Sequence, residues 1–307
     1  MIRILAFWAT ALLLLAPEML MAKSKAKRPK KTKAKVAATA SGQPSAWFGP
    51  MEPFHIIDNI YYIGTQDLAS FLITTPSGHI IVNSLYQSLV PRLQANTEKL
   101  GFKFEDVKVI LGNHAHGDHM EGNARIKELT GAEAYVMSED AALLRSMKRK
   151  GQPDPADHLM NDGDTVSLGG TTLTALRTPG HTPGCTTWTL TVHDNGAPLN
   201  GVIVCGMNLN AFDVLIGKQT YPGNAADYQG TFDRMRTLPV DVFLAPHGTI
   251  FQMMQKRARI GKTDKNPFID NKGFHYYMNK MERQFHEKLA AQRHKLQEPT
   301  PDSLPNP

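Results

Sequence analysis

The stretch Leu111-Gly112-Asn113-His114-Ala115-His116-Gly117-Asp118-His119 places three histidines and one aspartate within six residues. It follows a short apolar run typical of a buried strand, and a helical pattern comes after it. Because side chains alternate along an extended chain, His114 and His116 point the same way. Asp118 and His119 lie where the chain turns into the helix and can face a second metal. Imidazoles with one carboxylate are ordinary zinc ligands, so the stretch predicts a metal site.

Two further histidines lie in turns beside predicted strands. His181 lies in the Gly- and Pro-rich turn 178–184, and His247 follows the apolar run 242–244. Six ligands suffice for two metals that work together, and zinc lowers the pKa of its bound water to about 7. These residues therefore predict a hydrolase. The remaining histidines lack such a context and are expected at the surface: His55, His79, His158, His193, His275, His286 and His294.

Outward from this stretch, the chain alternates strands and helices. Turn residues at 76–78 predict a hairpin between the apolar runs 71–74 and 79–82. Strands are expected at 56–57, 60–63, 107–111, 134–136, 165–168, 171–176, 186–192, 202–205 and 242–244, and helices at 89–100, 123–130, 139–147, 228–238 and 275–295. The last helix has an apolar stripe of Tyr277, Met278, Met281, Phe285 and Leu289. Two β-rich halves, each covered by helices, predict an α/β sandwich.

The charge of the chain is concentrated in a short basic segment. The 307 residues carry a formal net charge of +6. Residues 23–35 hold seven lysines and one arginine without an acid, which leaves a net charge of −2 on residues 36–307. Attachment to anionic lipid or nucleic acid is one interpretation of this segment. We favour a solvated, disordered linker over residues 23–45, because its composition cannot bury enough apolar surface to fold.

The N-terminus has the features of a secretory signal peptide, which we place at residues 1–22. Arg3 gives a positive start, and residues 4–16 form an apolar run too short to span a bilayer comfortably. An uncleaved anchor is the alternative. The sequence predicts export to the periplasm, no stable membrane span after cleavage, and one folded domain over residues 46–307.

The pattern His114-x-His116-x-Asp118-His119, with His181 and His247, resembles the two-metal signature of the metallo-β-lactamase superfamily. The resemblance implies a four-layer αββα sandwich with the site at one edge of the sheets. It implies two zinc ions per chain, one bound by His114, His116 and His181 and the other by Asp118, His119 and His247. It also gives Asp118 a catalytic role, as a ligand that orients the attacking water.

One position separates the activities within that superfamily. Thioester hydrolases, lactonases and ribonuclease Z carry a bridging aspartate where this chain has Met207, and a thioether cannot replace a carboxylate between two zinc ions. The all-histidine first site, with no cysteine at the second, resembles subclass B3. The resemblance thus implies a β-lactamase that opens the lactam ring with a zinc-bound hydroxide. Residues that hold substrate in many members are replaced here, and Asn208 or Asn210 is the candidate substrate contact.

Other interpretations remain open at this stage. The alternative activities are those of a ribonuclease Z-like nuclease, a lactonase or a thioester hydrolase, and a zinc-binding domain without activity is a further possibility. We expect a small-molecule β-lactam as substrate, no nucleic-acid partner, and a monomer. Cys185 and Cys205 flank a hairpin whose loop is centred on Asn195, so they face each other and form either a disulfide or two buried thiols.

Overall fold

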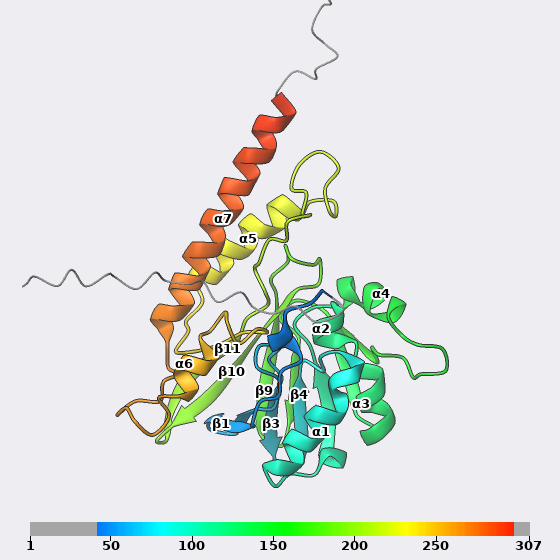
Figure 1. The fold of residues 1–307 in the computed structure, drawn as a ribbon, viewed down its shortest axis with the longest axis vertical. Coiled ribbons are helices and arrows are strands. Elements are labelled where there is room, and N and C mark those ends of the chain that lie inside the picture. The colour runs from blue at the N-terminus through cyan, green and yellow to red at the C-terminus, as the bar shows by residue number, and fades with distance from the viewer. Residues whose placement is uncertain (1–41, 298–307) are drawn as a thin grey trace, which may run out of the picture. The chain divides into compact units, whose positions relative to one another are not determined.

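The computed structural model describes residues 42–297 (Figure 1). The predicted signal peptide, residues 23–41 of the predicted linker and residues 298–307 lie outside the described residues. Residues 42–45, the end of that linker, are described, and a 3₁₀ turn, η1 (Ser45–Trp47), begins there. In the described part of the chain, we find no helix with the length and apolar character that a membrane span requires.

Within residues 42–297 the strands form two sheets, one of seven strands and one of five. The first sheet follows chain order, antiparallel from β1 to β4 and parallel from β4 to β7. Its strands are β1 (Phe54–Ile57), β2 (Ile60–Tyr62), β3 (Phe71–Thr75), β4 (Gly78–Val82), β5 (Val107–Leu111), β6 (Glu133–Met137) and β7 (His158–Met160).

The second sheet has the order β12-β11-β10-β9-β8 and is antiparallel except for the parallel pair β11–β12. Its strands are β8 (Thr165–Leu168), β9 (Thr171–Arg177), β10 (Thr186–Asp194), β11 (Ala197–Ile203) and β12 (Val242–Leu244). The β10–β11 hairpin turns through Asn195 and Gly196, both with positive φ, as a two-residue primed turn requires. That tight turn starts β11 at Ala197, five residues earlier than predicted.

Helices cover both outer faces of the two sheets, as the predicted αββα sandwich requires (Figure 1). One group lies beside the first sheet: α1 (Val90–Lys99), α2 (Gly117–Met120), α3 (Asn123–Thr130) and α4 (Ser138–Ser146), with the short turns η2 (Gln87–Leu89) and η3 (Phe104–Asp106). The other group lies beside the second sheet: α5 (Asn224–Arg236), α6 (Met253–Arg257) and α7 (Asn271–Gln297). The predicted stripe of α7 is buried from Tyr277 to Leu289.

Alternation along the strands explains why helices and a second sheet pack on opposite faces of the first sheet. Ile80 and Val82 of β4 belong to the core between the sheets, whereas Ile81 belongs to the core beneath α1 and α3. In β5, Leu111 faces the inter-sheet core and Ile110 faces the helices. A strand segment that is buried on both faces is apolar, which is why residues 80–82 and 109–111 carry no polar side chain.

Asn83 and Asn113, the latter within the stretch 111–119, join the two sheets. The Asn83 amide nitrogen donates to Asn113 Oδ1 at 2.7 Å, and Asn83 Oδ1 accepts the Asn113 backbone N–H at 3.0 Å. Across the sheets, Asn113 Nδ2 donates to the carbonyls of Thr186 at 2.9 Å and Ile203 at 3.1 Å. Both asparagines are fully buried, so these bonds fix the end of β5 against β10 and β11.

Candidate metal centre

The six predicted ligands converge at one edge of the two sheets, although they come from four places in the chain. His114 and His116 lie in the loop after β5, and Asp118 and His119 lie in α2. His181 lies between β9 and β10, and His247 follows β12. They form two clusters, each with its donor atoms within 4.8 Å of one another. We name His114, His116 and His181 the first ligand set, and Asp118, His119 and His247 the second ligand set.

In the first ligand set, two imidazole nitrogens face each other. Nδ1 of His181 lies 2.8 Å from the backbone carbonyl of Asn208, to which only a protonated nitrogen can donate. Nε2 of His181 then carries a lone pair in the neutral ring, and it lies 3.2 Å from Nδ1 of His116. A cation between the two rings satisfies both nitrogens, so this pair fits a metal.

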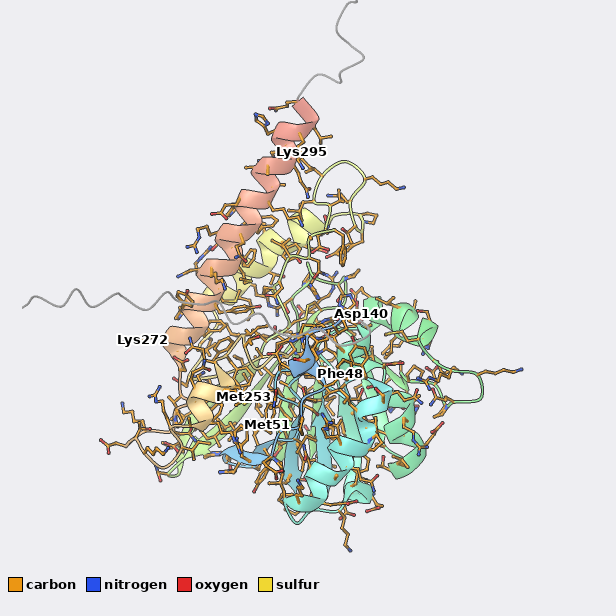
Figure 2. The ribbon with its side chains drawn as sticks, in the orientation of Figure 1. Phe48, Met51, Asp140, Met253, Lys272 and Lys295 are labelled. Carbon is orange, nitrogen blue, oxygen red and sulfur yellow. A yellow bond between two sulfur atoms is a disulfide. The ribbon has the colours of Figure 1, made fainter. Side chains whose placement is uncertain are left out.

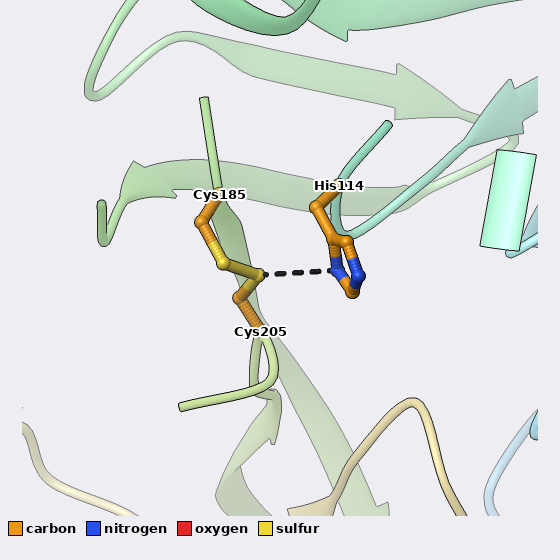
Figure 3. Close-up of side chains that lie close together, drawn as sticks. All are labelled: His114, Cys185 and Cys205. Carbon is orange, nitrogen blue, oxygen red and sulfur yellow. Dashed lines mark hydrogen bonds between the residues drawn. A yellow bond between two sulfur atoms is a disulfide. The ribbon is translucent and has the colours of Figure 1, made fainter. Parts of the chain in front are cut away.

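The third member of the first ligand set, His114, is buried and has one ring nitrogen without a hydrogen bond to any described residue, in the same cluster as His116 and His181. Its Nδ1 lies 3.5 Å from Sγ of Cys205, which carries no proton in the Cys185–Cys205 disulfide (Figure 3). The imidazole is therefore the donor in that contact. Its Nε2 is buried and has no hydrogen-bond partner among residues 42–297. A buried polar atom without a partner is costly, and a metal ligated by Nε2 removes that cost.

The second ligand set is organised around the carboxylate of Asp118. Its Oδ2 lies 3.2 Å from Nε2 of His119 and 3.5 Å from Nε2 of His247. Nδ1 of His247 lies 3.2 Å from Oδ2 of Asp67, which also accepts the Thr249 backbone N–H at its other oxygen. A carboxylate behind a ligating imidazole fixes its tautomer and orientation, as in many zinc sites. Nδ1 of His119 is also buried, without a hydrogen-bond partner among residues 42–297.

The protonation states suit metal binding at most of these positions. Burial lowers the pKa of His114 well below its usual value and, with the nearby His116, lowers the pKa of His181 to about 3. Burial also lowers the pKa of His119. His247 differs: burial opposes its protonation, but the carboxylates of Asp118 and Asp67 raise its pKa to about 9. Without metal a proton occupies His247, and a metal that binds there must displace it.

Cys185 and Cys205 form a disulfide with a Cα–Cα distance of 5.8 Å. Cys185 comes just before β10 and Cys205 just after β11, so the bond closes the predicted hairpin at its open end. Both residues are fully buried beside His114. A disulfide sulfur is not a thiolate, so these two sulfurs are not metal ligands in this form.

A cavity of about 600 Å³ opens over both ligand sets. Asn208 and Asn210, the predicted substrate contacts, line it. Aromatic side chains also line it, which the sequence did not indicate: Trp47, Tyr86 and Phe212. The Trp47 ring centroid lies 5.3 Å from that of His247, and Phe212 is 75% exposed at the cavity. Gln43, from the last part of the predicted linker, is a further lining residue.

Two tyrosines and a lysine fix the segment 207–211 at the rim of this cavity. Met207 is fully buried, and its backbone N–H donates to the Tyr277 hydroxyl at 2.8 Å. The Tyr228 hydroxyl donates to the Asn208 carbonyl at 3.2 Å, the same carbonyl that orients His181. The Lys288 ammonium donates to the carbonyls of Asn210 and Ala211. The segment thus places Asn208 and Asn210 at the cavity while Met207 packs into the core.

Some of the residues that organise the site could not be found from the sequence. Asp67 precedes β3 and contacts His247 across 180 positions, and no local motif marks it. The predicted surface position of His79 is wrong: its side chain is 8% exposed and packs edge-on against Phe102. The other six histidines without a predicted role are exposed, as expected.

The family pattern and the solved structures that this chain resembles point to the same family. The sequence pattern of the metallo-beta-lactamase superfamily matches residues 67–247. The structure is similar to BJP-1, a subclass B3 metallo-beta-lactamase of Bradyrhizobium japonicum, with a TM-score of 0.76 and 38% identity over 82% of this chain and 98% of that one. The FEZ-1 metallo-beta-lactamase of Legionella gormanii gives a TM-score of 0.76 and 38% identity over 80% and 98% of the two chains.

Curated relatives match over a shorter region. A hydroxyacylglutathione hydrolase of Hyphomonas neptunium is 34% identical over 90 residues, which are 29% of this chain and 30% of that enzyme. The chain thus spans about a third of the length of the first curated relatives it matches.

Proposed function

This chain belongs to the metallo-β-lactamase superfamily, and from that premise we propose that it is a zinc-dependent β-lactam hydrolase with two zinc ions. The observation that carries the proposal is the donor set itself. An all-histidine first ligand set lies beside an Asp-His-His second ligand set, and a buried methionine stands at the position of the bridging carboxylate. The similarity to a subclass B3 enzyme supports the same activity.

Each group of residues would have its own role in the proposed reaction. Zinc, when bound, supplies a Lewis acid and water that ionises near pH 7. The first ligand set would hold one ion, the second set the other, and Asp67 keeps His247 in the ligating orientation. Asp118 would serve as a ligand of the second ion and would orient the attacking water. The side-chain amides of Asn208 and Asn210 would donate hydrogen bonds to the carboxylate of the lactam substrate.

A thioester hydrolase is the second candidate, because the curated hydroxyacylglutathione hydrolase matches part of this chain. In that activity the chain would need a carboxylate shared between the two zinc ions. Met207, which stands at that position, is fully buried and has no carboxylate, and its backbone N–H donates to the Tyr277 hydroxyl. The cavity is lined by the carboxylates of Asp67 and Asp118, of which Asp67 is engaged by His247. These features favour the lactam over the thioester.

We infer that the protein acts after export to the periplasm, as a monomer. The positively charged start and apolar run of residues 1–22 support export, and the Cys185–Cys205 disulfide is typical of an oxidising compartment. Fractionation of cells that produce the full chain, with an antibody to the folded domain, tests the location.

Two substrates in parallel separate the candidate activities. The purified full chain, with excess zinc, is given a chromogenic cephalosporin and, separately, a glutathione thioester. We expect turnover of the cephalosporin, its loss in the presence of a chelator, and a loss of at least 100-fold in kcat/KM in His116→Ala. His286→Ala, the same change at an exposed position of α7, is the matched control and should retain activity. Zinc-dependent turnover of the thioester alone contradicts the proposal.

A further inference from the structure

Asp140 is a buried carboxylate that lies between two loops of the candidate metal centre. It belongs to the first turn of α4, where Figure 2 labels it. The residue is only 1% exposed. One of the loops runs from β5 to α2 and carries His114 and His116. The other is the turn between β9 and β10 that carries His181. Neither the sequence pattern nor the proposed chemistry assigns Asp140 a role.

The carboxylate accepts three hydrogen bonds, and each comes from one of these two loops. Its Oδ2 accepts the backbone N–H of Ala115 at 2.8 Å and the hydroxyl of Thr182 at 2.8 Å. Its Oδ1 accepts the backbone N–H of Gly184 at 2.7 Å. Ala115 lies between two ligands and Thr182 follows the third. One side chain therefore connects all three ligands of the first set through their immediate neighbours.

The chain packs closely against Asp140 at Gly184. A Cβ atom on Gly184 would lie 2.7 Å from Cβ of Asp140, closer than real side chains approach. Glycine at 184 lets the turn come near enough for its N–H to reach the carboxylate. Among the hydrogen bonds of residues 42–297, none joins Asp140 to the second ligand set, whose own supporting carboxylate is Asp67.

We propose that Asp140 is a positioning residue for the first ligand set, which holds the His114–His116 loop and the His181 turn at the separation that one metal ion requires. This rests on the proposed metal centre but not on the identity of the substrate. Removal of a supporting carboxylate typically weakens metal affinity 10- to 100-fold. The effect should fall on the first ligand set and spare the second.

The test measures zinc affinity at each set separately, by competition with a chromophoric chelator. In Asp118→Ala the second ligand set is incomplete, so zinc binding reports on the first set. In His181→Ala the first set is incomplete, so zinc binding reports on the second. In the Asp118→Ala background, Asp140→Asn should weaken zinc binding 10- to 100-fold. In the His181→Ala background it should change zinc binding by less than threefold. The visible spectrum of bound Co²⁺ should change in the first background alone.

Controls separate positioning from general stability. Asp270→Asn removes a partly buried carboxylate remote from the ligand sets in sequence, the partner of Lys256 at 2.9 Å, and should lower stability without changing zinc affinity. Thr182→Val removes one of the three hydrogen-bond donors with little change of shape and should weaken zinc binding at the first set about 3- to 10-fold. Thr182→Ser keeps the hydroxyl and should bind zinc at the first set as tightly as the wild type.

Two results overturn the proposal. One is an equal loss of zinc affinity at both ligand sets in Asp140→Asn. The other is wild-type zinc affinity in Thr182→Val, which counts even if the Asp140 variant does not fold. These outcomes are independent of lactam turnover. Selective loss of zinc in a protein that does not cleave a cephalosporin would uphold Asp140 and reject the proposed function.

Discussion

Asn113→Ala should destabilise the fold by breaking the connection between the two sheets. The side chain is fully buried and takes part in three hydrogen bonds, at 2.7, 2.9 and 3.1 Å. Alanine removes the Asn113 side chain as the partner of two backbone carbonyls and of the Asn83 amide, whose other acceptor is the Ala69 carbonyl at 3.4 Å. At about 1 kcal/mol net for each lost bond, the free energy of unfolding should fall by about 3 kcal/mol. For a domain of this size, that lowers Tm by about 6–12 °C.

The assay is urea unfolding in the presence of a chelator, because bound metal would add its own stabilisation. Asn59→Ala is the matched control. Its amide donates to the Thr74 carbonyl at 2.8 Å and the Thr171 hydroxyl at 3.0 Å, but it is only partly buried, so water can replace the lost partners. We expect a loss of about 1 kcal/mol there.

A double-mutant cycle with Asn83→Ala isolates the bond between the two asparagines. The coupling should be about 1 kcal/mol, since the two side chains share one direct bond at 2.7 Å. If Asn113→Ala costs less than 1 kcal/mol, or no more than Asn59→Ala does, the two sheets are not held together by this contact and the reasoning is wrong.

Three further predictions concern other parts of the chain. Replacing both Cys185 and Cys205 with alanine opens a loop with a sequence separation of 20 and should lower stability in denaturant by about 3 kcal/mol. Phe212→Ala should leave Tm unchanged, because the ring is 75% exposed, but should lower kcat/KM about fivefold for lactams with a large apolar substituent, measured by steady-state kinetics. Asp270 is partly buried, but its bond to Lys256 keeps its pKa below 3.8, so its stabilising contribution is present above that pH and is lost as the pH falls below it. Acid unfolding curves in chelator should therefore depend less on pH below 3.8 in Asp270→Asn than in the wild type.

The sequence predicted elements best where one local signal determined them. The strand 107–111 and the helix 123–130 have the predicted bounds, because each has an uninterrupted period and clear ends. Strand β7 was not predicted: it has three residues, of which His158 and Leu159 are exposed, so it lacks the alternation of a half-buried strand. It forms because β6 offers it a parallel edge, which is a tertiary effect.

In the candidate site, too, the sequence predicted some residues and not others. The six candidate ligands follow from residue types, from period-two alternation and from turns at strand ends. Their division into two sets follows from the family resemblance, and the structure brings each set together. The carboxylates behind them, Asp67 and Asp140, do not follow from any local pattern. Asp67 reaches His247 and Asp140 reaches Thr182 only after the chain has folded, so nothing near either residue in sequence marks its role.

The most direct test of the central claim is a crystal structure of the zinc-loaded protein with anomalous data on both sides of the zinc edge. We expect two anomalous peaks per chain. One should lie about 2.0–2.1 Å from Nε2 of His114, Nδ1 of His116 and Nε2 of His181, and the other should be bound by Asp118, His119 and His247. A single peak, or none at the first ligand set in protein that retains its fold, would contradict the account.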